Sequence, residues 1–207
     1  MQTTKTQITL STPFSKSYWK SALLEIKNIK TLSVVSVLIA LQLVISSIYI
    51  PLPLYGTQRI YFTFIISAVI ALAYGPFVGL YSAIINDLLG FVLHPQGPFF
   101  AGYILTAVVT SFIFSLFLYR ARLSILRLFL SRFFVNLIAN ILLNSLWDSI
   151  LIGKGYFPLM LSRIPKNLIM LPIEVIIFVA ILGFLIPFMK REGFIKHNPL
   201  EKKIPWI

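Results

Sequence analysis

Four polar residues recur at every fourth position within an apolar stretch, RFFVNLIANILLNSLWDSI, at residues 132–150. They are Asn136, Asn140, Asn144 and Asp148. Residues four apart stack on one face of an α-helix, so the spacing predicts a polar stripe along an otherwise apolar helix. Amides donate and accept hydrogen bonds and a carboxylate accepts several, so the stripe is chemically suited to binding a polar ligand.

The stripe has a simpler explanation, because asparagines also join helices inside membranes. Such interhelical bonds contribute only about 0.6 kcal/mol on average, which gives little reason to bury four polar groups in line. We therefore interpret the set as one wall of a polar cavity that opens to the outside.

Two more acids, Asp87 and Glu174, lie in the apolar stretches AIINDLLGF and NLIMLPIEVII. A carboxylate in such a place needs a partner, a proton or water.

The composition indicates which environment surrounds these residues. Of the 207 residues, 58% are hydrophobic and 12% are charged, and the mean hydropathy is +0.90. Soluble domains are about 45–50% apolar and about 25% charged. The apolar runs lack the alternation of a membrane β-barrel. We predict an all-α integral membrane protein with six transmembrane helices in one compact bundle.

Prolines and glycines separate the predicted spans, as in PLPLYG, HPQGP and GKGYFP. The chain is then divided into an N-terminal segment at 1–30, a membrane domain at 31–190 and a tail at 191–207. A span takes roughly 20 apolar residues. The six spans are expected near 31–50, 59–74, 77–93, 100–119, 128–152 and 167–189.

Basic residues are concentrated on one side of this arrangement. The formal net charge is +12, and all but four of the 18 Lys and Arg residues lie near the termini, between the fourth and fifth spans or, for Arg132, just inside the fifth span. The positive-inside rule predicts cytoplasmic termini and accounts for the charge without a nucleic-acid partner. Asp87, Asp148 and Glu174 then fall in the outer half of the membrane.

The four exceptions are Arg59, Lys154, Arg163 and Lys166. Basic side chains at a membrane boundary often extend toward the headgroups without any further role. Three of the four, however, are expected at the outer ends of the second and sixth spans, where the polar stripe also ends. Positive charge gathered there favours an anionic ligand.

Catalytic motifs are missing from the sequence. It contains no HExxH motif, no cysteine and no Ser/His/Asp grouping, and GKGYFP lacks the Ser or Thr of a phosphate-binding loop. We predict that the chain is not an enzyme and uses no cofactor and no metal. Any ATP-driven step would come from a partner.

Small residues mark two places where another helix could approach closely. Ser36 and Ala40 are four apart in the first span, and Gly75 and Gly79 are four apart at the start of the third. Such spacing lets helix backbones pack tightly. The sequence alone does not distinguish docking of a partner from packing within the bundle.

Three blocks of the sequence resemble a known family. YGPFVGLYSAIINDLLGFVLHPQGPFFAGY, NLIANILLN followed by LW, and RIPKNLIMLPIE are similar to the folate-specific substrate-binding (S) components, the FolT family, of energy-coupling factor (ECF) vitamin transporters. The resemblance covers about residues 31–190. It implies six membrane helices with cytoplasmic termini in a prokaryotic cell membrane, and an ABC-type complex with a transmembrane coupling subunit and two cytoplasmic ATPases. It assigns Ser36 and Ala40 to contact with that subunit.

The resemblance also implies folate as the ligand. We expect its flat pterin ring deep in the bundle and its glutamate tail, with two carboxylates, near the basic residues at the mouth. Either Asp148 or Asp87 meets the pterin, and Asp87 could instead pair with Lys166 or Arg163. The loops PLPLYGTQR and HPQGPFF would cover the entrance. The predicted ligand-binding residues are Arg59, Asp87, Tyr103, Asn140, Asn144, Trp147, Asp148, Arg163 and Lys166, with Tyr61, Phe64 and Phe99 as further possible walls.

Three other functions remain open. The chain could bind another vitamin, although the basic mouth argues against thiamine and riboflavin. It could be a stand-alone proton- or ion-coupled carrier, which the short chain without internal repeats disfavours. An intramembrane enzyme is disfavoured because the sequence lacks a nucleophile and a metal-binding constellation.

Overall fold

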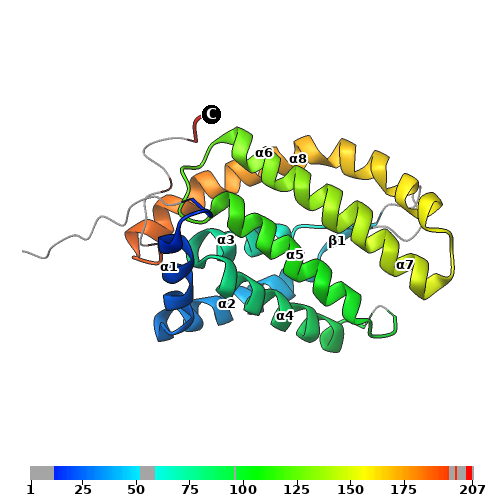
Figure 1. The fold of residues 1–207 in the computed structure, drawn as a ribbon, viewed down its shortest axis with the longest axis horizontal. Coiled ribbons are helices and arrows are strands. Elements are labelled where there is room, and N and C mark those ends of the chain that lie inside the picture. Colours follow the sequence, from blue (N-terminus) through cyan, green and yellow to red (C-terminus); the bar gives the residue numbers. More distant parts are fainter. Residues whose placement is uncertain (1–11, 52–58, 96, 196–198, 200–203, 207) are drawn as a thin grey trace, which may run out of the picture.

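Apolar helices make up most of the structure, a computed structural model of the chain (Figure 1). It describes residues 12–51, 59–95, 97–195, 199 and 204–206. Within this part of the chain, five helices are long and apolar enough to cross a membrane. One further apolar helix is shorter.

The helices lie lengthwise in an elongated bundle, and a short antiparallel strand pair follows the first long helix. The elements are α1 (Lys16–Ile26), α2 (Ile29–Ser46), β1 (Tyr49–Pro51), β2 (Arg59–Tyr61), α3 (Phe64–Tyr74), α4 (Pro76–Leu93), α5 (Ala101–Leu118), α6 (Ile125–Phe134), η2 (Val135–Leu143), α7 (Asn144–Ile152) and α8 (Tyr156–Arg191). α6, η2 and α7 are continuous and count as one spanning helix of 28 residues. We call the end with α1 and the last turn of α8 the terminus end, and the opposite end, with the α7–α8 connection, the loop end (Figure 1).

The second predicted span, 59–74, is only partly helical. Residues Arg59–Tyr61 pair with β1, so α3 begins at Phe64 and has 11 residues. Such a helix is about 16 Å long, roughly half the hydrocarbon thickness of a bilayer. Every residue of α3 except Ser67 is buried. Its apolar character therefore reflects burial by neighbouring helices on all sides, and six full-length spans are not observed among the described residues.

The last predicted span, 167–189, is the second half of a longer helix. α8 runs for 36 residues from Tyr156 and contains three prolines. Prolines are tolerated inside membrane helices where neighbouring groups bind the freed backbone carbonyls. Arg163 and Lys166 consequently lie within α8, and not in the connection that precedes it. Arg163 shares one face of α8 with Asn167 and Glu174, at the helical spacing of four and seven residues.

The polar stripe passes through a π-helical segment, η2. In an α-helix, residues four apart advance by about 40°, so the three steps from Asn136 to Asp148 would turn the stripe by about 120°. A π-helix bonds residue i to i+5 and has more residues in each turn, which opposes this drift. The π segment thereby helps to keep Asn136, Asn140 and Asp148 directed toward α8.

The two pairs of small residues have different surroundings. Gly79 packs inside the bundle, where an added Cβ would lie 2.5 Å from the Oγ of Ser111. Gly75 has a φ of +82°, which lets the chain turn between α3 and α4. Ser36 and Ala40 are instead exposed on the outer face of α2. The glycine pair is thus explained by packing and turning within the bundle, whereas Ser36 and Ala40 are open to a partner.

Several predicted features lie wholly or partly outside the described residues. The expected loops over the site include residues 52–58 and 96. The predicted tail begins at residue 191, but only some of its residues are described. Four lysines that entered the charge count also lie outside: Lys5, Lys196, Lys202 and Lys203.

Candidate ligand-binding site

Asp148, the last residue of the stripe, joins three helices. Its carboxylate on α7 accepts a hydrogen bond of 2.7 Å from the hydroxyl of Tyr103 on α5, and it forms an ion pair with Arg163 on α8. The side chains of Arg163 and Asp148 are 17% and 21% exposed. These three residues, which we call the Asp148 cluster, are partly open and retain unused hydrogen-bonding capacity.

Arg163 is held from more than one side. Its guanidinium also lies 3.5 Å from the backbone oxygen of Asn140, in the π segment. Its own backbone oxygen accepts a 2.8 Å bond from the amide of Asn167, one turn further along α8. The arginine is therefore positioned by α7, η2 and α8 together before any ligand is present.

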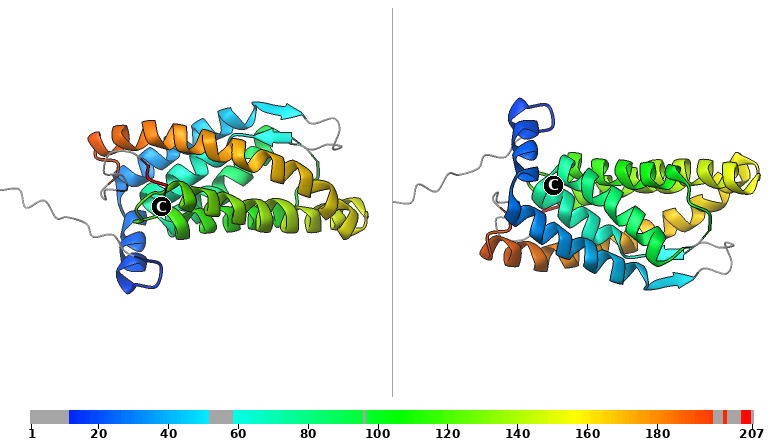
Figure 2. Two further views of the ribbon diagram at one scale, coloured as in Figure 1. Left: turned by 90° about the horizontal axis from the view of Figure 1, so that it is seen from above. Right: turned by 90° about the horizontal axis from the view of Figure 1, so that it is seen from below.

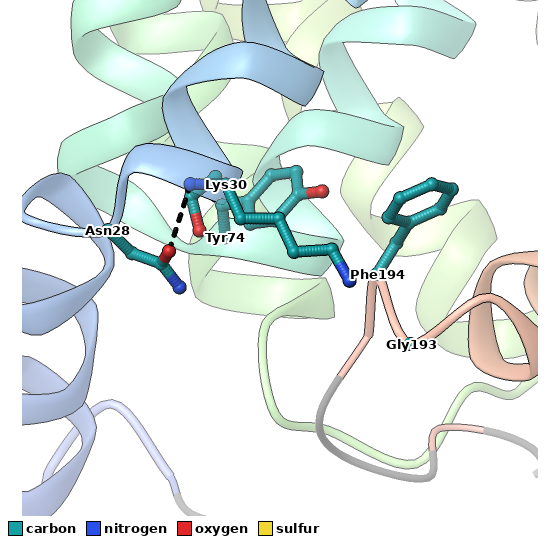
Figure 3. Close-up of a pocket in the computed structure, with 6 residues that line it drawn as sticks. Asn28, Lys30, Tyr74, Gly193 and Phe194 are labelled. Atoms are coloured by element: carbon teal, nitrogen blue, oxygen red, sulfur yellow. Dashed lines mark hydrogen bonds between the residues drawn. The ribbon is translucent and has the colours of Figure 1, made fainter.

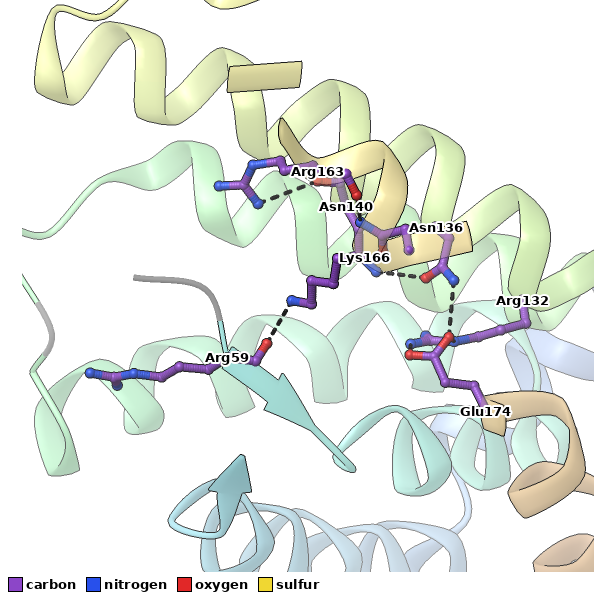
Figure 4. A network of polar contacts seen from close by, with 8 residues as sticks. Arg59, Arg132, Asn136, Asn140, Arg163, Lys166 and Glu174 are labelled. Carbon is purple, nitrogen blue, oxygen red and sulfur yellow. Dashed lines mark hydrogen bonds and ion pairs between the residues drawn. The ribbon is translucent and has the colours of Figure 1, made fainter. Parts of the chain in front are cut away.

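A second arginine–carboxylate pair lies deeper in the bundle (Figure 4). Arg132 on α6 donates two bonds to Glu174 on α8, of 2.8 and 2.5 Å, and the amide of Asn136 adds a third of 2.9 Å. The side chains of Arg132 and Glu174 are only 6% and 9% exposed, and the guanidinium lies 4.0 Å from the ring centre of Phe64. We call Arg132, Asn136 and Glu174 the Glu174 cluster.

The stripe connects the two clusters. Asn140 donates a 2.8 Å bond to the side-chain oxygen of Asn136, which itself donates to Glu174 (Figure 4). Asn140 also supplies the backbone oxygen that Arg163 contacts. A continuous series of polar contacts thus runs between α6–α7 and α8 from the Glu174 cluster to the Asp148 cluster.

The Glu174 cluster corrects one expectation. Arg132 was counted with the cytoplasmic basic residues, but its side chain is buried against Glu174. The missed signal is that Arg132 stands one four-residue step before Asn136, so the stripe begins at Arg132. The remaining basic residues are still concentrated near the terminus end, which the positive-inside rule predicts to be the cytoplasmic side.

Asn144 is the stripe residue outside this series. Its side-chain oxygen is buried and has no hydrogen-bond partner among the described residues, and the same holds for Asn86 on α4. A buried polar atom without a partner costs about 1–3 kcal/mol. Such an atom next to the Asp148 cluster is available to a ligand donor.

Asp87 does not fill the alternative role considered for it. Among the described residues Asp87 forms no ion pair, because Arg163 binds Asp148 and the ammonium of Lys166 donates a 2.7 Å bond to the backbone oxygen of Arg59. Asp87 therefore keeps its carboxylate free of these cations.

The basic residues predicted at the mouth do not all converge. Figure 4 shows the side chain of Arg59 directed away from Lys166 and Arg163. Its guanidinium lies 4.5 Å from the ring centre of Tyr49 and 3.5 Å from the hydroxyl of Tyr61, a hydrogen bond that raises the pKa of Arg59. Of these predicted residues, Arg163 thus contacts the stripe, Lys166 bonds the backbone of Arg59, and the side chain of Arg59 points elsewhere.

Aromatic residues border the Asp148 cluster on the α5 side. The indole of Trp147 donates a 2.9 Å bond to Thr106, and its ring centre lies 5.6 Å from that of Phe100. Phe100 in turn lies 6.1 Å from Tyr103. Tyr103 and Trp147 are thereby fixed as flat surfaces beside the polar stripe.

A small cavity is present at the other end of the molecule (Figure 3). It has a volume of about 30 Å³ and is lined by Asn28, Lys30, Thr31, Tyr74, Gly193 and Phe194. This volume suits about one water molecule, which could bind the unpartnered hydroxyl of Tyr74. It is too small for a ring system.

At the stripe the polar side chains bond to one another, so a ligand there would replace some of these bonds. No group of His, Cys, Asp or Glu suited to a metal occurs in the described part of the chain.

Comparisons with known proteins agree with this architecture. Residues 30–182 match the family described as ECF transporter, substrate-specific component. The chain is 33% identical over 119 residues to "Folate transporter FolT" of Clostridium novyi, a match that covers 58% of this chain and 69% of that protein. It is 34% identical over 148 residues to "Folate transporter FolT" of Leuconostoc mesenteroides, covering 68% and 77%.

A solved structure is also similar. "Crystal structure of FolT bound with folic acid" aligns with a TM-score of 0.68 and 27% identity, and the match covers 84% of this chain and all of that chain. The overall arrangement of this chain is therefore similar to that of a protein solved with folic acid bound.

Proposed function

We propose that this chain, a member of the family of substrate-specific components of ECF transporters, binds folate near the loop end of its bundle. Two relatives are named folate transporters, and the similar solved structure holds folic acid. The observation in this chain that supports the proposal is the Asp148 cluster. It offers a positioned arginine, a carboxylate and a phenol at a partly open site next to aromatic rings.

The glutamate tail of folate is assigned to Arg163 and Lys166. Arg163 already binds a carboxylate, that of Asp148, so the ligand carboxylate has the chemistry to take the same place. Lys166 lies one turn away on α8, and its ammonium donates to the backbone oxygen of Arg59. Exchange of one carboxylate for another keeps the guanidinium paired throughout, which avoids an isolated charge.

The pterin is assigned to the stripe. Asn144 has an unpartnered oxygen, and Asn140 uses its amide nitrogen toward Asn136. Asp87, which forms no ion pair with a described residue, would accept hydrogen bonds from the amino and ring nitrogens of the pterin, because Asp148 lies directly beside Arg163, where the tail is assigned. Tyr103 and Trp147 would then contact the ring faces.

Delivery into the cell requires partners. We assign energy supply to a transmembrane coupling subunit and two ATPases, because the sequence carries no nucleotide-binding motif. The exposed pair Ser36 and Ala40 on α2 is the assigned contact with the coupling subunit. The terminus end is assigned to the cytoplasm on the basis of its lysines and arginines.

Calorimetric titration of the purified, detergent-solubilised chain tests the ligand. Folate, riboflavin and thiamine are compared without ATP or partners. Tight binding of folate alone is the expected result, and a folded chain that prefers either other vitamin would overturn the assignment. Uptake into vesicles that contain the chain with and without ATPase subunits then separates this function from that of a stand-alone carrier.

A further inference from the structure

α1 lies outside residues 30–182, the part of the chain that matches the ECF family. It has 11 residues, and the side chain of Ser15 caps its first turn by accepting from the backbone N–H of Tyr18. Figure 2 shows α1 crossing the terminus end, roughly perpendicular to the long helices and protruding beyond them. Because the long helices cross the membrane, α1 lies approximately in the plane of its surface.

One side of α1 is fixed to the bundle. Tyr18 and Ala22 are fully buried, and the hydroxyl of Tyr18 donates a 2.8 Å bond to the backbone oxygen of Ser115 at the end of α5. The ring of Tyr18 lies edge-on to that of Tyr119 at 5.1 Å. Burial raises the pKa of the Tyr18 hydroxyl, so this group remains a neutral donor. α1 is thus a docked helix with a defined rotation.

The apolar face of α1 is wider than the part that touches the bundle. Ile26 continues the line of Tyr18 and Ala22 at four-residue spacing, and Leu23 continues the line of Trp19. Trp19 packs edge-on against Phe77 of α4. Leu23 and Ile26 are 50% and 39% exposed, so an apolar strip extends past the bundle without a protein partner in the described chain.

Directly beside this apolar strip α1 is basic. Lys16 and Lys20 on α1 and Lys27 at its C-cap fall within about 40° of one another at 100° per residue, between the exposed side chains of Leu23 and Leu24, and all three lysines are exposed. None of them forms an ion pair with a described residue. The acid on this helix, Glu25, is buried and accepts a 2.9 Å bond from Thr31. The exposed surface of α1 therefore combines apolar and cationic groups without an exposed acid.

We propose that α1 binds the membrane surface. Leu23 and Ile26 insert at the boundary of the acyl chains, and Lys16, Lys20 and Lys27 bind the phosphates of anionic lipids. A helix parallel to the surface whose exposed lysines lie directly beside exposed leucine and isoleucine side chains presents the cationic and apolar groups that interfacial helices use. The charge complements the negative cytoplasmic leaflet, if the terminus end faces the cytoplasm. The inference does not depend on the identity of the transported ligand.

Site-directed labelling measures the position of α1, and the absence of cysteine makes single labels simple to place. The full chain carrying Leu23→Cys and a spin label is reconstituted in nanodiscs of phosphatidylcholine, with or without phosphatidylglycerol. Accessibility to oxygen, which partitions into lipid, is compared with accessibility to a water-soluble nickel chelate. Val37→Cys, on the exposed face of α2, serves as the lipid reference, and Lys154→Cys, in the α7–α8 connection, as the water reference.

The label at position 23 is expected to resemble the lipid reference more closely than the water reference. Combined substitution of Lys16, Lys20 and Lys27 by Gln should lower the amount of phosphatidylglycerol that co-purifies with the chain at least threefold, whereas Lys154→Gln should not. Equal nickel accessibility at positions 23 and 154 in both lipid mixtures would overturn the proposal. So would a label that becomes protected only when a protein partner is added. Unfolding temperatures of the variants show that each is folded.

Discussion

The Asp148 and Glu174 clusters use the same pair of groups, an arginine and a carboxylate, in different surroundings. In the Glu174 cluster both side chains are less than one tenth exposed, and three donated bonds reach the carboxylate. In the Asp148 cluster about one fifth of the Arg163 side chain and of the Asp148 side chain is exposed. Burial and saturation with hydrogen bonds suit a permanent connection between helices, whereas partial exposure suits exchange with a ligand. The difference separates a structural pair from a binding pair on one continuous polar stripe.

The largest effect is expected from breaking the buried pair. Glu174→Ala leaves Arg132 buried without a counter-charge, which typically destabilises by about 3–5 kcal/mol. The midpoint of unfolding in detergent should fall sharply. Replacing both partners together, Arg132→Met with Glu174→Leu, should recover much of the loss. A Glu174→Ala chain as stable as the original would show that this cluster does not fasten α6 to α8.

A smaller effect is expected at Asn144, and on a different quantity. Asn144→Leu removes an unpartnered buried oxygen, so the free energy of unfolding should change by no more than about 1 kcal/mol. Folate affinity should fall about fivefold to thirtyfold, as for loss of one ligand hydrogen bond. Asn136→Leu is the matched control, because it should lower stability by removing a bond to Glu174. Unchanged affinity in Asn144→Leu would remove this residue from the site.

Asp148→Asn should strengthen the binding of the glutamate tail relative to the binding of the pterin. The substitution weakens the internal competitor for Arg163 while preserving the shape of the side chain. Folate should therefore gain relative to pteroate, which lacks the glutamate tail, by about threefold to tenfold in the ratio of dissociation constants. Folate and pteroate share the pterin, so the ratio of their dissociation constants reports on the tail alone, whichever carboxylate meets the pterin. An unchanged ratio would argue against exchange at Arg163.

The smallest effect on the isolated chain is expected on the outer face of α2. Ser36→Leu and Ala40→Leu alter an exposed surface, so stability should change by less than about 0.5 kcal/mol and folate binding should stay the same. Transport by the assembled complex should nevertheless fall, because larger side chains prevent close helix contact. Gly79→Leu is the contrasting variant, since Gly79 packs inside the bundle and its substitution should destabilise the isolated chain. Full transport by Ala40→Leu would place the docking surface elsewhere.

Much of the architecture follows from the sequence. Long apolar runs predict membrane helices, and the four-residue spacing correctly predicts that Asn136, Asn140 and Asp148 share one side. The second predicted span, 59–74, is helical only from Phe64, and a helix that is apolar all round is compatible with either lipid or burial in protein. Local pattern alone does not distinguish these two environments.

The pairing of the charges could not be predicted, because it depends on how α8 is rotated and on the π segment. Arg163 and Asp148 were expected to bind different parts of a ligand, yet they contact each other. Arg59 was expected to join Arg163, but the strand pair directs its side chain toward Tyr49. Arg132 was counted as a cytoplasmic residue because it lies just inside the fifth predicted span, but its side chain bonds Glu174. Each outcome depends on contacts between segments far apart in the chain.

The most direct test of the account is the affinity of Arg163→Ala for folate and for pteroate, measured by calorimetry beside the original chain and Lys154→Ala. If Arg163 exchanges Asp148 for the ligand's glutamate tail, the variant should lose about 30-fold or more in folate affinity. Its affinity for pteroate should change much less, and Lys154→Ala should bind both ligands normally. Equal losses for folate and pteroate, or no loss for either, would contradict the assignment of the Asp148 cluster as the binding pair.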